Sequence, residues 1–146
     1  MSTSYVPLDP ERVKELRNRS YPDGLICLNL LKFKNTATLD GEELPGAEIY
    51  QRYAASAVHT IAEVGGCIVA FGSAAFSLIG PQDEWDSMAI VWYPSVDDFI
   101  RMGALPAYQR IVDLRTLALA DSRLIPLAAP SGYASYVKGI DPSSLS

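Results

Sequence analysis

The segment that most constrains the fold is LICLNLLKFK, residues 25–34, because it has the pattern of a β-strand with two apolar faces. Successive side chains of a strand point to opposite faces. One face would carry Leu25, Cys27, Asn29, Leu31 and Phe33, and the other would carry Ile26, Leu28, Leu30 and Lys32. Such a strand is covered on both sides in a folded protein. Asn29 interrupts one apolar face, and burying its amide without a hydrogen-bond partner costs about 1–3 kcal/mol.

The rest of the chain predicts an α+β domain around this strand. A short helix begins at Asp9–Pro10, and the strand over 25–34 is followed by a loop over 35–46 and a helix over 47–64. Two strands, over 67–79 and 85–93, are then joined by a turn at 80–84. Helices over 96–104 and 106–120 and a last strand over 122–128 complete the prediction. The order β-α-β-β-α-β is ferredoxin-like, with one antiparallel sheet and helices on one face. It places strand 85–93 between strands 25–34 and 67–79.

The chain divides into an N-terminal helical arm (1–24), the ferredoxin-like domain (25–128) and a C-terminal tail (129–146). The tail is rich in Ser, Pro and Gly, which predicts a loose segment or one that lies over a partner. The face of the sheet without helices would be too apolar for contact with water. A second copy that packs sheet against sheet would cover it, so we expect a homodimer.

The helix over 47–64 has a predicted orientation. Its expected inner face carries Tyr50, Ala54, Ala57, Val58 and Ile61, followed by Gly65. The opposite face carries Arg52, Ser56, His59 and Glu63. His59 is the only histidine of the chain, and this orientation predicts that it is exposed.

The composition of the chain excludes several classes of function. The chain has 146 residues, enough for one domain, and its net charge of −5 argues against nucleic acid as a partner. It has no apolar run of about 18 residues and no signal-peptide core, so we expect no membrane span and a cytoplasmic location.

Cofactor and metal signals are weak. Cys27 and Cys67 fall on non-adjacent strands, roughly 9–10 Å apart, which is too far for a disulfide. One histidine and two separated cysteines make a metal site or a Ser-His-Asp triad improbable. The glycines of EVGGCIV run from helix to strand, the wrong order for a dinucleotide-binding loop. We therefore expect no cofactor.

Asn29 and Arg115 are the first two candidate site residues. If the Asn29 face lies under the helices, its amide lines a pocket where it could stabilise an enolate, and the alternative is a hydrogen bond to backbone. Arg115 could clamp a substrate carboxylate, because an unpaired buried guanidinium is unfavourable. The alternative for Arg115 is a structural pair with Asp86, Asp113 or Asp121. The helical stripe that would carry it is Tyr108, Val112, Arg115 and Leu119.

Trp85, Asp86 and several tyrosines complete the candidates. A carboxylate beside an indole can have its pKa raised by desolvation and act as a base, so Asp86 is a candidate base beside Trp85. The alternative is an edge aromatic and an acid that bonds a turn or an arginine. Tyr50, Tyr53, Tyr93 and Tyr108 are candidate ligand contacts, although such tyrosines are more often core residues with a hydrated hydroxyl.

The motifs DGLICLNLLKFK, AEIYQRYAASAV, LIGPQDEWDSMAIVWYPSVDDFIRM and PAYQRIVDLRTLALADSRLI together resemble the family called domain of unknown function 1330. The resemblance covers about residues 7–128, and Asn29 lies within the first motif. It implies a member of the dimeric α/β-barrel superfamily, in which ferredoxin-like monomers pair sheet to sheet. That superfamily includes cofactor-free monooxygenases, isomerases, lactone-forming enzymes, haem enzymes and proteins with no known reaction, so the fold alone does not assign a function.

Two hypotheses follow. The first is a cofactor-independent enzyme, similar to a monooxygenase or an isomerase, that acts on a small, partly apolar carboxylate or carbonyl compound. In it Asn29 is the oxyanion donor, Arg115 the anion clamp and Asp86 the candidate base. The second is a non-catalytic dimer that binds a small molecule or serves as an accessory subunit. A filled interior, with Asn29 and Arg115 both bonded to protein groups, would favour the second.

Overall fold

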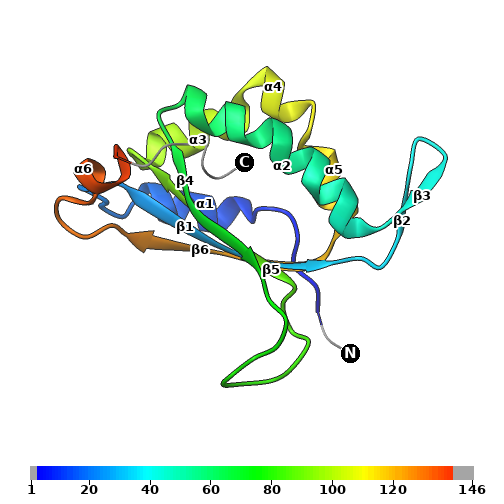
Figure 1. Ribbon diagram of the computed structural model, residues 1–146. Helices are drawn as coiled ribbons and strands as arrows, with labels where there is room; N and C mark the ends of the chain where they lie inside the picture. The colour runs from blue at the N-terminus through cyan, green and yellow to red at the C-terminus, as the bar shows by residue number, and fades with distance from the viewer. Residues whose placement is uncertain (1–2, 140–146) are drawn as a thin grey trace.

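The computed structural model describes residues 3–139 and confirms the ferredoxin-like topology (Figure 1). Four antiparallel strands lie in the order β4-β5-β1-β6, so β5 separates β1 from β4 as predicted. The strands are β1 (Leu25–Phe33), β4 (Cys67–Ser73), β5 (Ser87–Tyr93) and β6 (Leu119–Ala128). The helices over one face are α1 (Pro10–Arg17), α2 (Gly46–Glu63), α3 (Val96–Ala104), α4 (Pro106–Gln109) and α5 (Val112–Ala118). None of the helices among residues 3–139 has the length and hydropathy of a membrane span.

Local signals fix where several helices begin. The Asp9 carboxylate accepts a hydrogen bond from the Glu11 amide at 3.0 Å, and Ser95 Oγ accepts one from the Asp98 amide at 3.0 Å. Both are N-cap interactions, which satisfy backbone donors that a first helical turn leaves unpaired. Helix α2 begins at Gly46, where a Cβ atom would lie 2.6 Å from the Ala118 carbonyl oxygen. Glycine is required at Gly46 because two backbone segments approach it closely.

The core lies between the sheet and the helices. The largest cluster joins both layers and consists of Leu16, Leu25, Cys27, Ile61, Val64, Val91, Tyr93, Phe99 and Met102. Leu16 comes from the predicted N-terminal arm, so that segment packs on the domain. Cys27 on β1 and Cys67 on β4 lie on non-adjacent strands, as predicted, and Cys27 is buried in this cluster. A second cluster of Leu44, Ile49 and Ala118 closes the other end.

The prediction that helix 47–64 buries Tyr50, Ala54 and Val58 is wrong by about one position. The side chains that α2 buries are Ile49, Tyr53, Ala57, Thr60 and Ile61. The wide apolar content of this helix allows both orientations, and packing on the sheet selects between them. His59 is exposed in either case, and the structure confirms this.

The predicted loop over 35–46 contains a small β-hairpin. Strands β2 (Ala37–Leu39) and β3 (Glu42–Leu44) pair with each other, joined by Asp40 and Gly41. Both turn residues have positive φ, 51° and 81°. A two-residue Asp-Gly turn with positive φ at both positions is typical of a tight hairpin, and this signal was present in the sequence. The hairpin places Leu44 in the core.

The strands predicted over 67–79 and 85–93 are longer than the strands that the structure contains. Strand β4 ends at Ser73 and β5 begins at Ser87. Residues 74–86 form a long connection, here called the β4–β5 loop, which extends from the sheet on the side away from α2 (Figure 1). The register of β4 shifts between Ile68 and Ala70, so the strand has an irregularity at Val69.

The predicted single helix over 106–120 is two helices. Helix α4 ends at Gln109 and α5 begins at Val112, with Ile111 between them in a non-ideal conformation of φ −116° and ψ −14°. Consecutive β-branched residues, Ile111 and Val112, weaken helix continuation at this point. The expected stripe is therefore divided between two helices.

The C-terminal tail is more ordered than predicted. Helix α6 (Tyr133–Val137) packs Val137 against Trp92 and Ala129, on the face of the sheet opposite the other helices. Helices thus lie on both faces at this end of the sheet. Residues 140–146 of the predicted tail lie outside the described residues.

Candidate functional site

Four of the candidate residues come together between α2, α4 and α5, and we call them the Arg115 site: Tyr50, Tyr53, Tyr108 and Arg115. The hydroxyl oxygens of Tyr53 and Tyr108 are 2.8 Å apart and share a hydrogen bond. The rings of Tyr50 and Tyr53 lie 5.2 Å apart, and those of Tyr53 and Tyr108 lie 6.0 Å apart. Phe33 extends this aromatic row to β1, with its ring 5.4 Å from Tyr50. The site therefore connects the helix layer with the sheet.

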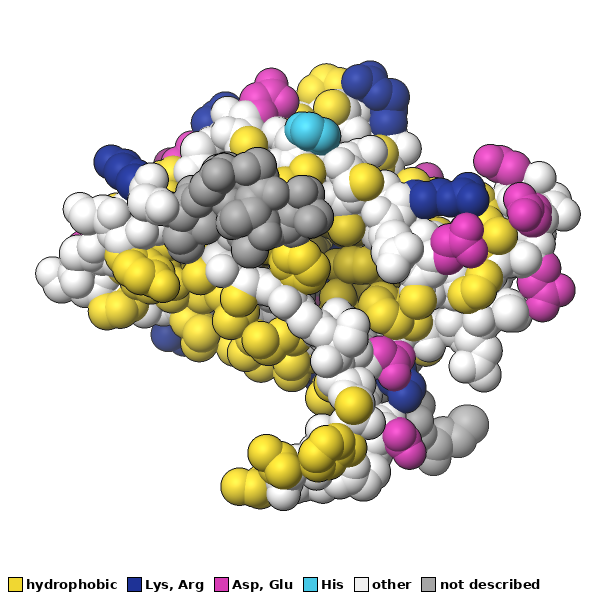
Figure 2. All heavy atoms as spheres, viewed as in Figure 1, with side chains coloured by type: hydrophobic (Ala, Val, Ile, Leu, Met, Phe, Trp, Pro, Cys, Tyr) yellow, Lys and Arg dark blue, Asp and Glu magenta, His cyan; other side chains and the backbone are white. Residues whose placement is uncertain are grey.

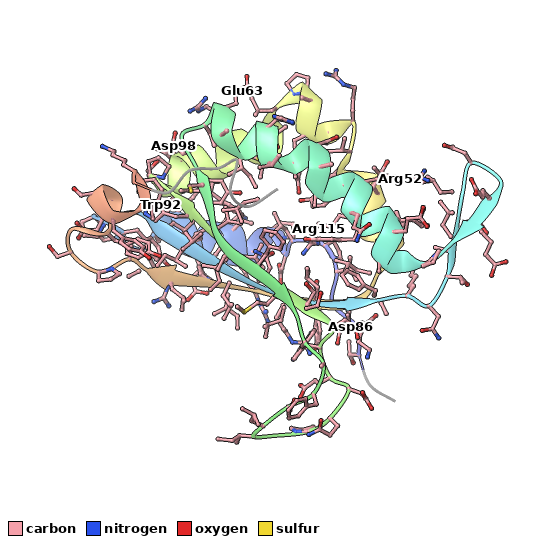
Figure 3. All side chains as sticks on the ribbon, viewed as in Figure 1. Arg52, Glu63, Asp86, Trp92, Asp98 and Arg115 are labelled. Atoms are coloured by element: carbon pink, nitrogen blue, oxygen red, sulfur yellow. The ribbon has the colours of Figure 1, made fainter. Side chains whose placement is uncertain are left out.

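Arg115 supplies a positive charge to this site. Figure 3 places its side chain beneath α2, between the helices and the sheet. The side chain is half-buried, and its Nη1 donates a hydrogen bond of 2.9 Å to the Val6 carbonyl. Within residues 3–139 no acidic side chain forms an ion pair with it. The predicted structural pairs with Asp86, Asp113 and Asp121 are thus not formed, and a partly desolvated cation favours a nearby anion.

Tyr50 and Tyr53 are neutral hydrogen-bonding groups of the site. Burial raises the pKa of Tyr50, and the Arg115 guanidinium opposes this shift. Burial also raises the pKa of Tyr53, and its neighbour Tyr108 raises that pKa further. Phenols with raised pKa values stay protonated near neutral pH, so they donate hydrogen bonds and do not serve as bases. A guanidinium beside neutral phenols is suited to a carboxylate or an enolate.

Asn29 lies on the face of β1 that is toward the helices. Its Nδ2 is 3.4 Å from the carbonyl oxygens of Cys27 and Ala89 and donates to both. These bonds are longer than usual, so they satisfy the amide only weakly. They agree with the alternative predicted for Asn29 from the sequence, in which its amide bonds to backbone groups. Phe71 pairs with Ala89 on the edge strand and is 56% exposed, so this end of the sheet is open on its helix side.

Asp86 lies apart from the Arg115 site. Its Oδ2 accepts a hydrogen bond of 2.8 Å from the Phe33 amide, and its Oδ1 is 3.5 Å from Lys32 Nζ. Its own amide donates to the Leu31 carbonyl at 2.8 Å. Figure 3 shows Asp86 at the root of the β4–β5 loop, while Arg115 lies above the sheet. These contacts attach the loop to the end of β1.

Trp85 also lies outside the Arg115 site. The Arg123 guanidinium lies between two aromatic rings, 5.0 Å from Trp85 and 4.9 Å from Tyr5. Arg123 Nη1 donates to Asp121 at 2.8 Å. Trp85 therefore packs by a cation–π contact on Arg123, which makes a second such contact with Tyr5 of the N-terminal segment.

The N-terminal segment is the part of the site that the sequence did not predict. The Tyr5 amide donates to Asp121 Oδ1 at 2.8 Å, and Ser122 Oγ donates to the Tyr5 carbonyl at 2.7 Å. With the Arg115 bond to Val6, these contacts hold residues 5 and 6 beside α5 and β6. Backbone carbonyls carry no sequence signal, so Val6 could not be identified as a partner of Arg115. Within residues 3–139 no three His, Cys, Asp or Glu side chains are placed so that they could hold a metal ion together.

Comparison with known proteins places the chain in a family. The protein-family model for the domain of unknown function DUF1330 matches residues 43–127. The chain belongs to this family. A protein of unknown function, RPA0582 from Rhodopseudomonas palustris, is 34% identical, with a TM-score of 0.80 over 88% of this chain and 99% of that one. A structure of methylated RPA0582 gives the same identity and TM-score over 90% and 98% of the chains.

More distant structures share the fold alone. A NIPSNAP family protein from Agrobacterium tumefaciens is 12% identical, with a TM-score of 0.50 over 80% of this chain and 95% of that one. No curated protein matches the chain. The family and its two similar structures carry no stated activity, so the function is argued from the Arg115 site.

Proposed function

We propose that this protein binds a small, partly apolar molecule with a carboxylate group at the Arg115 site. The observation that carries the proposal is a half-buried guanidinium without an acidic partner among residues 3–139, next to phenols held neutral by burial. Arg115 would pair with the carboxylate, and the tyrosine row would contact the apolar part of the ligand. The hydroxyls of Tyr53 and Tyr108 would add hydrogen bonds.

The contacts of the candidate residues favour a protein that binds this ligand without catalysing a reaction. A base is needed to remove a proton from a substrate, and the tyrosines are poor bases while they remain protonated. Asp86 is engaged with Phe33 and Lys32 at the other side of the sheet. The Asn29 amide donates to backbone carbonyls, which leaves it less available as an oxyanion donor.

A cofactor-independent enzyme of the monooxygenase or isomerase type is the second candidate. The pair of hydroxyls 2.8 Å apart beside a cation favours it, because neutral donors and a positive charge stabilise a developing enolate. In this form Asn29 and Arg115 would contact the reacting carbonyl. Turnover of a bound ligand would distinguish this candidate from simple binding.

A thermal-shift experiment tests the binding proposal. Benzoate and phenylacetate are the probes, and benzamide is the neutral control. A ligand at about a hundred times its Kd stabilises by about 2.7 kcal/mol and raises Tm by several degrees. We expect this shift with the carboxylates and its loss in Arg115→Met. Arg110→Met, at an exposed arginine nearby, is the matched control and should keep it. An equal shift in Arg115→Met would contradict the proposal.

We also infer a homodimer formed through the sheet. On the face of the sheet opposite α2, next to the part that α6 covers, lies an apolar patch, here called the helix-free face. It carries Leu28, Leu30, Met88, Ile90, Ile125 and Leu127, which alternate with the core side chains of β1, β5 and β6. Met88, Ile125 and Leu127 are 37%, 41% and 42% exposed. A contiguous apolar face of this kind is typical of a protein interface, and a two-fold axis lets one face cover its copy. Sedimentation that gives only the 15.9 kDa monomer would contradict this.

The remaining partner and location inferences rest on charge and cysteines. A net charge of −5 supports a protein that does not bind nucleic acid. Two unpaired cysteines support a reducing compartment such as the cytoplasm.

A further inference from the structure

The tip of the β4–β5 loop carries three large apolar side chains in contact with water. Phe76, Leu78 and Ile79 are 68%, 89% and 97% exposed. Figure 2 shows hydrophobic side chains gathered at the end of this loop, and further hydrophobic side chains on the underside of the sheet above it. Single exposed apolar residues are common, but three together on a projecting loop mark a surface that is covered by something else.

The loop is held in shape by its own polar contacts. The Gln82 side chain bonds both the Ser77 amide, at 2.9 Å, and the Ser77 carbonyl, at 2.8 Å. The Ala74 amide donates to the Asp86 carbonyl at 2.8 Å, and Lys32 Nζ donates to the Asp83 carbonyl at 2.7 Å. The loop therefore presents its apolar tip without packing it on its own domain. Ordering of this kind before binding reduces the entropy lost on association.

A hollow lies at the root of the same loop. It has a volume of about 330 Å³, with apolar walls from Leu30, Trp85 and Met88. Ser73 and Ser87 also line it, and Gly72 leaves it open because a Cβ at that position would meet no atom within 4 Å. Leu30 and Met88 belong to the helix-free face, so the hollow is continuous with the proposed dimer interface.

We propose that two copies of this chain exchange their β4–β5 loops, so that Leu78 and Ile79 of each copy dock in the hollow of the other. The inference rests on the proposed homodimer and adds a reciprocal contact to it. In a two-fold dimer a projecting group and its receptor on one chain satisfy each other twice. Residues 72–82 have no charged side chain, so the contact adds no like-charge repulsion between two chains of net charge −5.

The dimer dissociation constant, measured by analytical ultracentrifugation, tests the exchange. Leu78→Asp/Ile79→Asp places charge on the tip, and Gly72→Phe fills the hollow from a position with free space. We expect each change to raise the Kd by at least about tenfold. Leu8→Asp, at a leucine 57% exposed on the N-terminal segment, is the matched control and should leave the Kd unchanged. Circular dichroism checks that each variant is folded.

Cross-linking tests whether the loop tip of one copy reaches the hollow of the other. Ile79→Cys and Met88→Cys, combined in a Cys67→Ser background, should form a covalent dimer on oxidation, whereas a link within one chain leaves a monomer on a denaturing gel. A wild-type protein that is monomeric would overturn both the homodimer and the exchange. A wild-type dimer whose Kd is unaffected by both changes, without a cross-link, would overturn the exchange alone. Binding of the wild-type chain to phosphatidylcholine vesicles, lost in Leu78→Asp/Ile79→Asp, would assign the tip to a lipid surface and also overturn the exchange.

Discussion

The contacts of Asp86 predict a structural role that can be measured as stability. Its carboxylate accepts the Phe33 amide at 2.8 Å and lies 3.5 Å from Lys32 Nζ. A hydrogen bond to a charged group contributes about 1.5–3 kcal/mol, and the side chain of Asp86 is 38% exposed, so water replaces part of what is lost. We therefore expect Asp86→Ala to lower the free energy of unfolding by about 1.5 kcal/mol. Asp86→Asn keeps an oxygen acceptor and should lose about half as much.

The ion pair with Lys32 should contribute little. Both side chains are about one-third exposed, and pairs of this kind contribute about 0–1 kcal/mol. Lys32→Met is therefore the control, and we expect it to change the free energy of unfolding by less than about 0.5 kcal/mol. The Lys32 bond to the Asp83 carbonyl is on the surface, where water replaces it.

Urea unfolding followed by tryptophan fluorescence measures these differences, with all variants at one protein concentration because a dimer links stability to concentration. If Asp86→Ala were as stable as the wild type, the carboxylate would not hold the end of β1, and the candidate base role would regain weight. If Lys32→Met lost as much as Asp86→Ala, the ion pair would be the source of the effect. Either result would refute the reasoning.

Other predictions concern buried and exposed titratable groups. Cys27 is 2% exposed and burial raises its pKa to about 12, so a thiol reagent near neutral pH should label the partly exposed Cys67 first and Cys27 only after unfolding; labelling of both at one rate would contradict the burial. Burial raises the folded-state pKa of Cys27, Tyr53 and Tyr93 above their ordinary values of 9.0 and 10.0, so their contribution to stability is complete below about pH 9 and is lost as the pH rises further. The urea midpoint should therefore be lower at about pH 11 than at about pH 8, and a midpoint that is equal or higher at about pH 11 would count against it. His59→Ala, at an exposed position of α2, should change the free energy of unfolding by less than about 0.5 kcal/mol, and a loss above about 2 kcal/mol would show that the orientation of α2 is wrong.

The sequence predicted the elements whose signals are local. The apolar run of β1, the helix start at Asp9–Pro10 and the order of strands and helices were enough for the ferredoxin-like topology. The β2–β3 hairpin had a local Asp-Gly signal that outweighs the polar composition of the loop. The orientation of α2 was less certain from the sequence, because apolar residues surround much of that helix.

The features of the fold and of the site that the sequence did not predict depend on contacts between distant parts of the chain. Strand β4 stops at Ser73 although apolar residues continue to Ile79, because pairing with β5 ends where the loop leaves the sheet. The Arg115 bond to the Val6 carbonyl joins residues 109 positions apart, and no pattern in the sequence encodes it. The tyrosines and Arg115 were predicted as candidates, but their separation from Trp85 and Asp86 follows only from the fold.

The most direct test of the account is the side-chain NMR signal of Arg115. The Nε–H resonance of Arg115, assigned by its loss in Arg115→Lys, is followed while benzoate is added, with benzamide as the neutral control. Pairing with a carboxylate predicts a saturable shift of this resonance with benzoate and none with benzamide. If the Arg115 resonance stayed unchanged while those of exposed arginines such as Arg110 moved, carboxylate binding at the Arg115 site would be contradicted.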